Sequence, residues 1–192
     1  MTASSVLQSL RAATSEQHRA IETGAAVEAR LRDPRRRPAM LARLHQLHAA
    51  VERAIAPWSE WMESAGYRPQ SRSPLIAAGL RALGAPPPAP FNPPPLASPG
   101  EALGWIYVAD GSALGGRVMR RAMIADGIDL TGLDFLDPHG DETGPRWRAF
   151  LVAMDRACAA GLARPADVVR GGRDAFNLAA DLLGETAPAE CA

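Results

Sequence analysis

The stretch EALGWIYVADGSALGGRVMRRAMIA, residues 101–125, decides the fold class. It follows a helix-start signature, in which Ser98 supplies a side-chain cap, Pro99 occupies the first helical position and Glu101 stands three residues after the serine. The helical periodicity of this stretch recurs along the chain, whereas short alternating strand patterns do not occur. The sequence therefore predicts an all-α protein that folds as a compact bundle of several helices.

Three glycines lie inside the predicted helix, at Gly111, Gly115 and Gly116. Each costs about 1 kcal/mol relative to alanine in a helix interior, so three within six residues require a reason. One reason is a kink or the close approach of a flat ligand to bare backbone, and another is a tight helix–helix contact. The hexapeptide is not a phosphate loop, because it has no Walker lysine and no preceding strand. These residues alone do not choose between ligand approach and helix packing.

The rest of the chain predicts a single domain over residues 1–192, with a core at about 4–184 and a tail at 185–192. The segment GAPPPAPFNPPPLASPG, residues 84–100, cannot be helix or strand because proline removes backbone donors and fixes φ. We expect it to be an extended surface loop and not a domain boundary. The other predicted helices cover residues 4–23, about 40–58, 74–83, 145–162 and 165–183.

Composition and charge exclude several function classes. The chain has 21 basic and 21 acidic residues, so no net field favours nucleic acid or an anionic membrane. Two cysteines, Cys158 and Cys191, do not make a disulfide framework. The N-terminal residues lack the apolar run of a signal peptide, and no segment approaches the roughly 20 apolar residues of a membrane span. We therefore expect a soluble, cytoplasmic protein that binds neither nucleic acid nor membrane.

His18 lies on the apolar stripe of the first predicted helix, which also carries Leu7, Leu10, Thr14 and Ile21. Most histidines on such a face are buried core residues without a ligand. Glu22, one turn later, is placed to accept a hydrogen bond from the imidazole Nδ1–H, which would leave Nε2 free for a metal. The other interpretation of this pair is an ordinary i,i+4 contact. A buried imidazole backed by a carboxylate, together with a separate glycine-rich helix, is nevertheless what a haem held between two helices requires.

Three segments carry a family resemblance. LRAATSEQHRAIE (10–22) is similar to the proximal helix of haem oxygenases, and GWIYVADGSALGGRVMRR (104–121) looks like their distal helix. FLDPHGDETGPRWRAFLVAMD (135–155) resembles a later segment of the bacterial branch associated with bacteriophytochromes. The resemblance extends over about residues 7–183.

The resemblance implies a haem site between a proximal helix and a kinked distal helix. His18 would be the iron ligand, Glu22 its hydrogen-bond partner, and the three glycines would lie against the distal face of the ring. It also implies cleavage of haem to biliverdin, CO and iron with O2, using electrons from an external ferredoxin or reductase. A biliverdin-accepting bacteriophytochrome is a further partner that the resemblance suggests.

Two departures from the family pattern concern the distal water and the haem propionates. Many haem oxygenases place an Asp on the distal helix to anchor water, and the matching position here is Ser112. Asp110 lies about 200° away on a straight helix, so it takes that role only if the helix bends at Gly111. The propionate partners are not clearly matched, and the candidates by helix position are Arg11, Arg156 and Arg173.

Two alternatives to a haem oxygenase stay open. Ser112 leaves room for a haem carrier or sensor that does not turn haem over. His45 and His48, three residues apart, are half of a possible metal site and would suit a relative without haem. We expect His139 to be an ordinary loop residue.

Overall fold

The computed structural model describes residues 5–184, apart from the side chains of Glu22 and Thr23. This part of the chain contains helices and turns and no strand, so the predicted all-α class is confirmed. The expected tail at 185–192 lies outside the described residues. Three 3₁₀ turns join the α-helices: η1 (Ala56–Trp58), η2 (Asp134–Leu136) and η3 (Gly140–Glu142). The α-helices are α1 (Ser5–Gly24), α2 (Val27–Arg32), α3 (Arg37–Ile55), α4 (Ser59–Ser64), α5 (Ser73–Ala82), α6 (Pro99–Ala125), α7 (Thr143–Ala159) and α8 (Pro165–Leu183).

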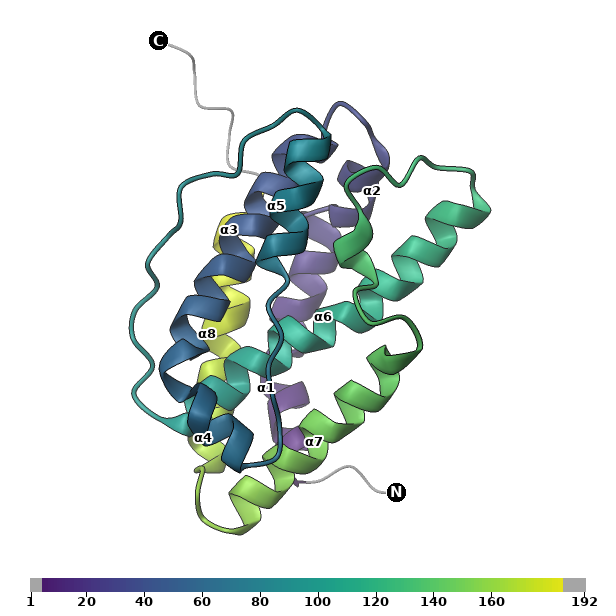
Figure 1. Ribbon diagram of the computed structural model, residues 1–192. Coiled ribbons are helices and arrows are strands. Elements are labelled where there is room, and N and C mark those ends of the chain that lie inside the picture. Colours follow the sequence, from purple (N-terminus) through teal and green to yellow (C-terminus); the bar gives the residue numbers. More distant parts are fainter. Residues whose placement is uncertain (1–4, 185–192) are drawn as a thin grey trace.

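Helix α8 is the element around which the bundle is assembled. It packs against α6, α1 and α3, while α5 packs on α3 (Figure 1). The main contacts of α1 and of α6 are therefore with α8. This arrangement places the helix of His18 and the helix of the three glycines on one common support.

Glycines bring α8 close to both of these helices. A Cβ atom on Gly104 of α6 would lie 2.7 Å from the carbonyl carbon of Gly171, and one on Gly171 would lie 2.7 Å from Cα of Glu101. The next residue, Gly172, faces Leu10 and Thr14 of α1. Larger residues would force these backbones apart, so glycine at these positions sets the spacing of the three helices.

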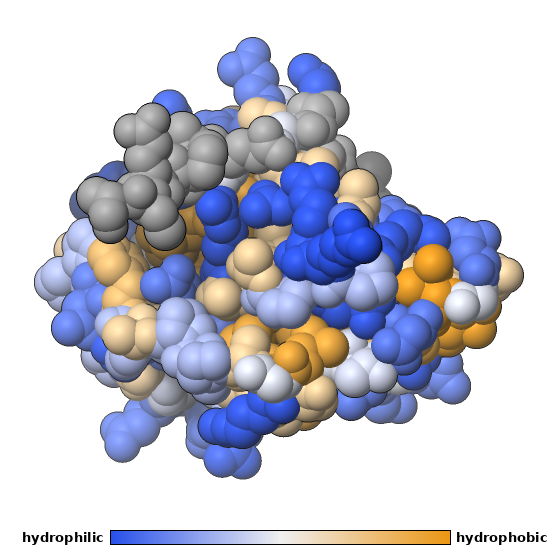
Figure 2. All heavy atoms as spheres, turned by 90° about the horizontal axis from the view of Figure 1, so that it is seen from above, coloured by the Kyte–Doolittle hydropathy of each residue, from blue (hydrophilic) through white to orange (hydrophobic). Residues whose placement is uncertain are grey.

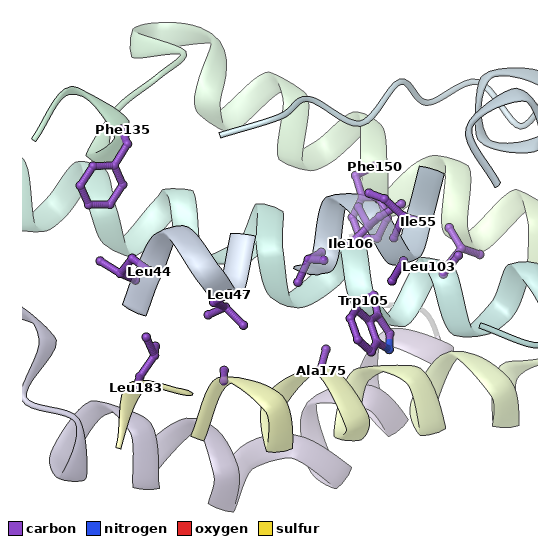
Figure 3. Packing of buried hydrophobic residues seen from close by; sticks show 14 of the residues in the cluster. Leu44, Leu47, Ile55, Leu103, Trp105, Ile106, Phe135, Phe150, Ala175 and Leu183 are labelled. Carbon is purple, nitrogen blue, oxygen red and sulfur yellow. The ribbon is translucent and has the colours of Figure 1, made fainter. Parts of the chain in front are cut away.

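The core fills the space between α3, α6, α7 and α8. Leu44 and Leu47 of α3, Ile106 of α6 and Phe150 of α7 point into this interior (Figure 3). Ile106 and Phe150 are at most 1% exposed. Seen from above, the outer surface is mostly hydrophilic, with apolar side chains in a few separate groups (Figure 2).

The start of α6 follows the predicted signature. The Ser98 side chain accepts a hydrogen bond from the Glu101 backbone N–H at 3.2 Å, and the Glu101 carboxylate accepts one from the Ala97 N–H at 2.7 Å. The proline-rich segment before it is extended and runs along one side of the bundle from α5 to α6 (Figure 1). Arg53 of α3 donates a hydrogen bond to Asn92 of this segment.

Candidate functional site

His18 is exposed on α1, and the expectation that its imidazole is buried is wrong. Leu7, Leu10 and Thr14, earlier on the same stripe, are buried as predicted. The first half of the stripe packs on α8, and at His18 the contact with α8 includes the ring of Phe176. These two rings lie edge to face, with centroids 5.8 Å apart and planes at 74°. The imidazole is therefore both anchored on one side and accessible from outside.

The side chain of Glu22 is not among those that the structure describes. The helix itself continues through this residue to Gly24, so Glu22 stands one turn after His18. Its predicted hydrogen bond to the imidazole stays a prediction.

The three glycines of α6 have three different surroundings. A Cβ atom on Gly115 would meet nothing within 4 Å, so this position faces open space. A Cβ atom on Gly111 would lie 3.4 Å from the Trp147 ring of α7, an ordinary van der Waals contact. One on Gly116 would overlap the carbonyl oxygen of Leu136 and lie 3.2 Å from its carbonyl carbon. Helix packing therefore accounts for Gly116, while Gly115 is open to a ligand.

Gly115 belongs to an exposed apolar strip on α6. Its neighbours Leu114 and Val118 are 36% and 68% exposed. We call Leu114, Gly115 and Val118 the α6 apolar face. A solvent-exposed strip of this kind is suited to covering by an apolar ligand.

Asp110 points away from the α6 apolar face. Five residues along an α-helix separate it from Gly115, which corresponds to about 140°. Helix α6 continues as α-helix through Gly111. The Asp110 carboxylate instead accepts a hydrogen bond from the Tyr67 hydroxyl. Burial raises the pKa of Asp110, and the Tyr67 hydrogen bond and the Arg72 charge oppose that shift.

Ser112 lies on the open side of α6, about 60° from Gly115. Its hydroxyl donates to the Ala109 carbonyl at 2.7 Å and accepts from the Arg72 guanidinium at 2.6 Å. Arg72 also donates to the Ala109 carbonyl. Ser112 is thus held by a buried cation that reaches it from the segment between α4 and α5, which crosses α6 (Figure 1).

Arg72 is fixed by a carboxylate on α3. The side chain of Glu52 accepts hydrogen bonds from the backbone N–H groups of Arg72 and Ser73, at 2.7 and 2.8 Å. Sequence reasoning missed Arg72 and Tyr67, because both lie in a connecting segment without periodicity. Only the fold brings them to α6.

A small cavity lies behind α6, on the side of Asp110. Its volume of about 10 Å³ corresponds to a single water molecule. His139, expected to be an ordinary loop residue, is half-buried in its wall, where burial and the Arg146 charge lower its pKa. The lining residues are Tyr67, Arg72, Asp110, Ala113, His139, Thr143, Arg146 and Trp147.

The three candidate propionate partners are exposed, and they lie on three different helices. Arg11 stands two turns before His18 on the same face of α1, within about 20°. Arg156 is on α7, and Arg173 lies with Arg170 along an open groove of α8. Of these three side chains, only Arg11 shares a helix face with His18.

The histidine pair of the metal alternative is only partly accessible. His48 is buried, and burial together with the Arg72 charge holds its pKa well below the usual value. Within residues 5–184, no three His, Cys, Asp or Glu side chains gather as a metal site. None of the helices described here is long and apolar enough to cross a membrane.

His18 and the α6 apolar face lie on two helices that both pack on α8, within an all-helical fold. A heme oxygenase of Xanthomonas campestris pv. campestris is 31% identical over 137 residues, which make up 71% of this chain and 82% of the relative. The chain belongs to the haem oxygenase family, whose members bind haem. No protein-family model matches the chain.

The fold agrees with this assignment. The crystal structures of NO- and CO-bound heme oxygenase from Neisseria meningitidis match with a TM-score of 0.74 at 23% identity, over 96% of this chain and 94% of that chain. The described residues also fit haem chemically. An accessible imidazole is a donor for iron, and the α6 apolar face offers the ring a surface from which side-chain bulk is missing at Gly115.

Proposed function

We propose that this chain is a single-domain haem oxygenase, which cleaves haem to biliverdin, CO and iron with O2 and electrons from an external donor. Membership of the family supports this activity. When bound, haem supplies both the iron that activates O2 and the ring that is cleaved. The protein's own part is to bind the ring, orient it and control access of water.

His18 is proposed as the axial ligand. The His18 side chain is exposed on α1, and this observation carries the proposal. Glu22, one turn later, would accept the other N–H and fix the tautomer. Of the four histidines in the sequence, this one alone lies on the first helix.

The α6 apolar face is proposed as the distal wall of the site. Gly115 lets the ring approach the backbone, and Leu114 and Val118 lose exposed apolar surface when the ring covers them. Gly111 and Gly116 would act on the other sides of α6, by allowing Trp147 and Leu136 to fix the position of the helix.

Ser112 is proposed to hold water beside the ring, at the edge of this wall. Its hydroxyl is already oriented by Arg72 and Ala109, so an added water would meet a fixed polar group. Asp110 would act indirectly, through the charge that it places near Arg72.

Arg11 is the proposed first partner of a propionate, because it shares the face of His18. Arg156 and Arg173 remain candidates for the second carboxylate. For the electron donor we propose a ferredoxin or reductase, and for the product a bacteriophytochrome that accepts biliverdin. The electron donor and the product acceptor rest on the sequence resemblance, and the three arginines rest on helix position.

One experiment tests the proposed activity. Haemin is added to the purified protein, a Soret band is recorded, and a reductant is then supplied under air. Loss of the Soret band with appearance of biliverdin supports the oxygenase. A stable haem complex that does not bleach supports the second candidate, a carrier or sensor, which Ser112 at the distal position favours. Failure to bind haemin contradicts both.

A further inference from the structure

We propose that Phe176 is a positioning residue for His18, and that its ring edge fixes the plane in which the imidazole presents itself to iron. This inference rests on the proposed function of His18. Phe176 lies on α8, and none of the assignments above gives this residue a role in the site.

Two successive contacts carry the argument. A Cβ atom on Gly172 would lie 3.7 Å from the Thr14 methyl carbon, so the two helices are close at that level. One turn later on both helices, Phe176 meets His18. From the first contact to the second, the residue number rises by four on α1 and by four on α8. The two helices therefore run in the same direction here, and their successive turns lie opposite one another. The aromatic pair is thus the next layer of one continuous helix interface.

The layer before the aromatic pair is rigid. Thr14 is buried, and its hydroxyl donates to the Leu10 carbonyl at 2.8 Å, which fixes the side chain. Leu10 and Thr14 occupy the space that a side chain at Gly172 would fill. The backbone of α1 therefore has little freedom to move relative to α8 at the turn just before His18.

Phe176 is a firm support, while His18 is not constrained by burial. The Phe176 side chain is 7% exposed, whereas His18 is exposed. Rotation about the terminal torsion of a histidine is broad and nearly two-fold, so an exposed imidazole needs contacts to choose one plane. An edge-to-face contact at 5.8 Å and 74° is the favoured geometry of an aromatic pair and supplies such a choice.

The haem-free protein offers the first test. The imidazole C–H signals of His18 are assigned by their loss in His18→Gln and followed by NMR. We expect Phe176→Leu to remove the ring-current shift of these signals, whereas Phe176→Tyr retains it. Leu178→Ala removes bulk from another face of α8 and is the matched control, for which no change is expected. Unchanged His18 signals in Phe176→Leu would overturn the proposal.

The second test uses the haem-loaded ferric protein with cyanide. The spread of the haem methyl hyperfine shifts depends on the imidazole plane, and we expect it to change in Phe176→Leu and to match the wild type in Phe176→Tyr. The same spread in all variants would mean that Phe176 does not position the ligand. If Phe176→Leu does not fold, Phe176→Met takes its place in both tests. Absence of a Soret band in the wild type would contradict the proposed function, while the first test would still decide the Phe176–His18 contact.

Discussion

The carbonyl oxygen of Leu136 lies against the bare backbone of Gly116, in the space that a Cβ atom would occupy. The segment after Leu136 is also tied to α6 by Arg117, which donates to the Gly140 carbonyl and forms an ion pair with Asp141 at 2.5 Å. Gly116 is therefore a packing residue, although it is adjacent to Gly115, which faces open space. The sequence alone does not distinguish the two glycines.

We expect Gly115→Ala and Gly116→Ala to have opposite effects on stability. At Gly115 the methyl group meets nothing, so the haem-free protein should gain up to about 1 kcal/mol from helix propensity. At Gly116 the overlap with Leu136 should outweigh that gain and leave a loss of about 1–2 kcal/mol. Thermal unfolding without haem measures both, and each kcal/mol corresponds to roughly 2–4 °C in a chain of this size.

Haem affinity should fall in Gly115→Ala, the variant that is expected to gain stability. Haemin titration is expected to show weaker binding for Gly115→Ala, because the added methyl group occupies the proposed distal wall. Wild-type affinity and turnover in Gly115→Ala would remove Gly115 from the site. A Gly116→Ala protein as stable as the wild type would contradict the packing role.

We expect His18→Ala to lose the Soret band of histidine-ligated haem. The exposure of His18 leaves room for a replacement ligand, so added imidazole should restore the band in part. The matched control is His139→Ala, which removes a histidine from the cavity behind α6 and should keep the ligated spectrum. A wild-type Soret position in His18→Ala without imidazole would show that another group binds the iron.

For the polar side chains of α6, we expect Ser112→Ala to slow haem breakdown by a few-fold, equivalent to about 1 kcal/mol, and Asp110→Asn to slow it less. Ser112 lies on the open side of the helix and Asp110 faces Tyr67 on the other. Single-turnover decay of the reduced complex under O2 compares them. A slower Asp110→Asn than Ser112→Ala would mean that the Asp110 carboxylate acts on the haem side.

The buried His48 should make stability depend on pH. Its folded pKa lies well below the usual value of 6.5, because burial and the charges of Arg72 and His45 disfavour the protonated form. Below about pH 6.5 the unfolded chain therefore binds more protons than the folded one. The contribution of neutral His48 to the free energy of unfolding is complete above about pH 6.5 and is lost as the pH drops toward the folded pKa. The slope should reach up to about 1.4 kcal/mol per pH unit for the proton at His48.

Thermal unfolding of the haem-free protein at pH 5, 6 and 7 checks this dependence. We expect His48→Gln to flatten the rise in stability between pH 5 and 7. His45 and His139 shift in the same direction and leave part of the slope in place. Equal slopes in His48→Gln and wild type would show that the pKa of His48 is the same in the folded and unfolded chain.

Helices of 10 residues or more were predictable, and the two helices of six residues were not. The signature at Ser98 located the first residue of α6, and Pro165–Leu183 was anticipated as α8. Helices α2 and α4 have six residues each, too few to show a helical period, and both were missed. Their positions depend on tertiary contacts, such as the ion pair of Arg32 with Asp126 at 2.7 Å.

Predictability of the site followed the same rule. The helices that carry His18 and Gly115 were identified from spacing, but the exposure of His18 was not, since it depends on how α1 packs in the bundle. Arg72 reaches Ser112 across 40 residues of sequence, which no local pattern encodes. The tandem Gly171–Gly172 in α8 carried the same signal as the glycines of α6 and would have indicated the close helix contact.

Because Gly115 and Gly116 have different surroundings, selection for stability and selection for activity should act on different codons, although the two are adjacent. In a library randomised across α6, survival of protease digestion would enrich glycine at 116 and at 104, where neighbouring backbone leaves no room, but not at 115. Screening the same library for biliverdin colour would add 115 to that set. The difference between the two outcomes would map the ligand-facing side of α6 position by position, without a bound ligand having to be seen.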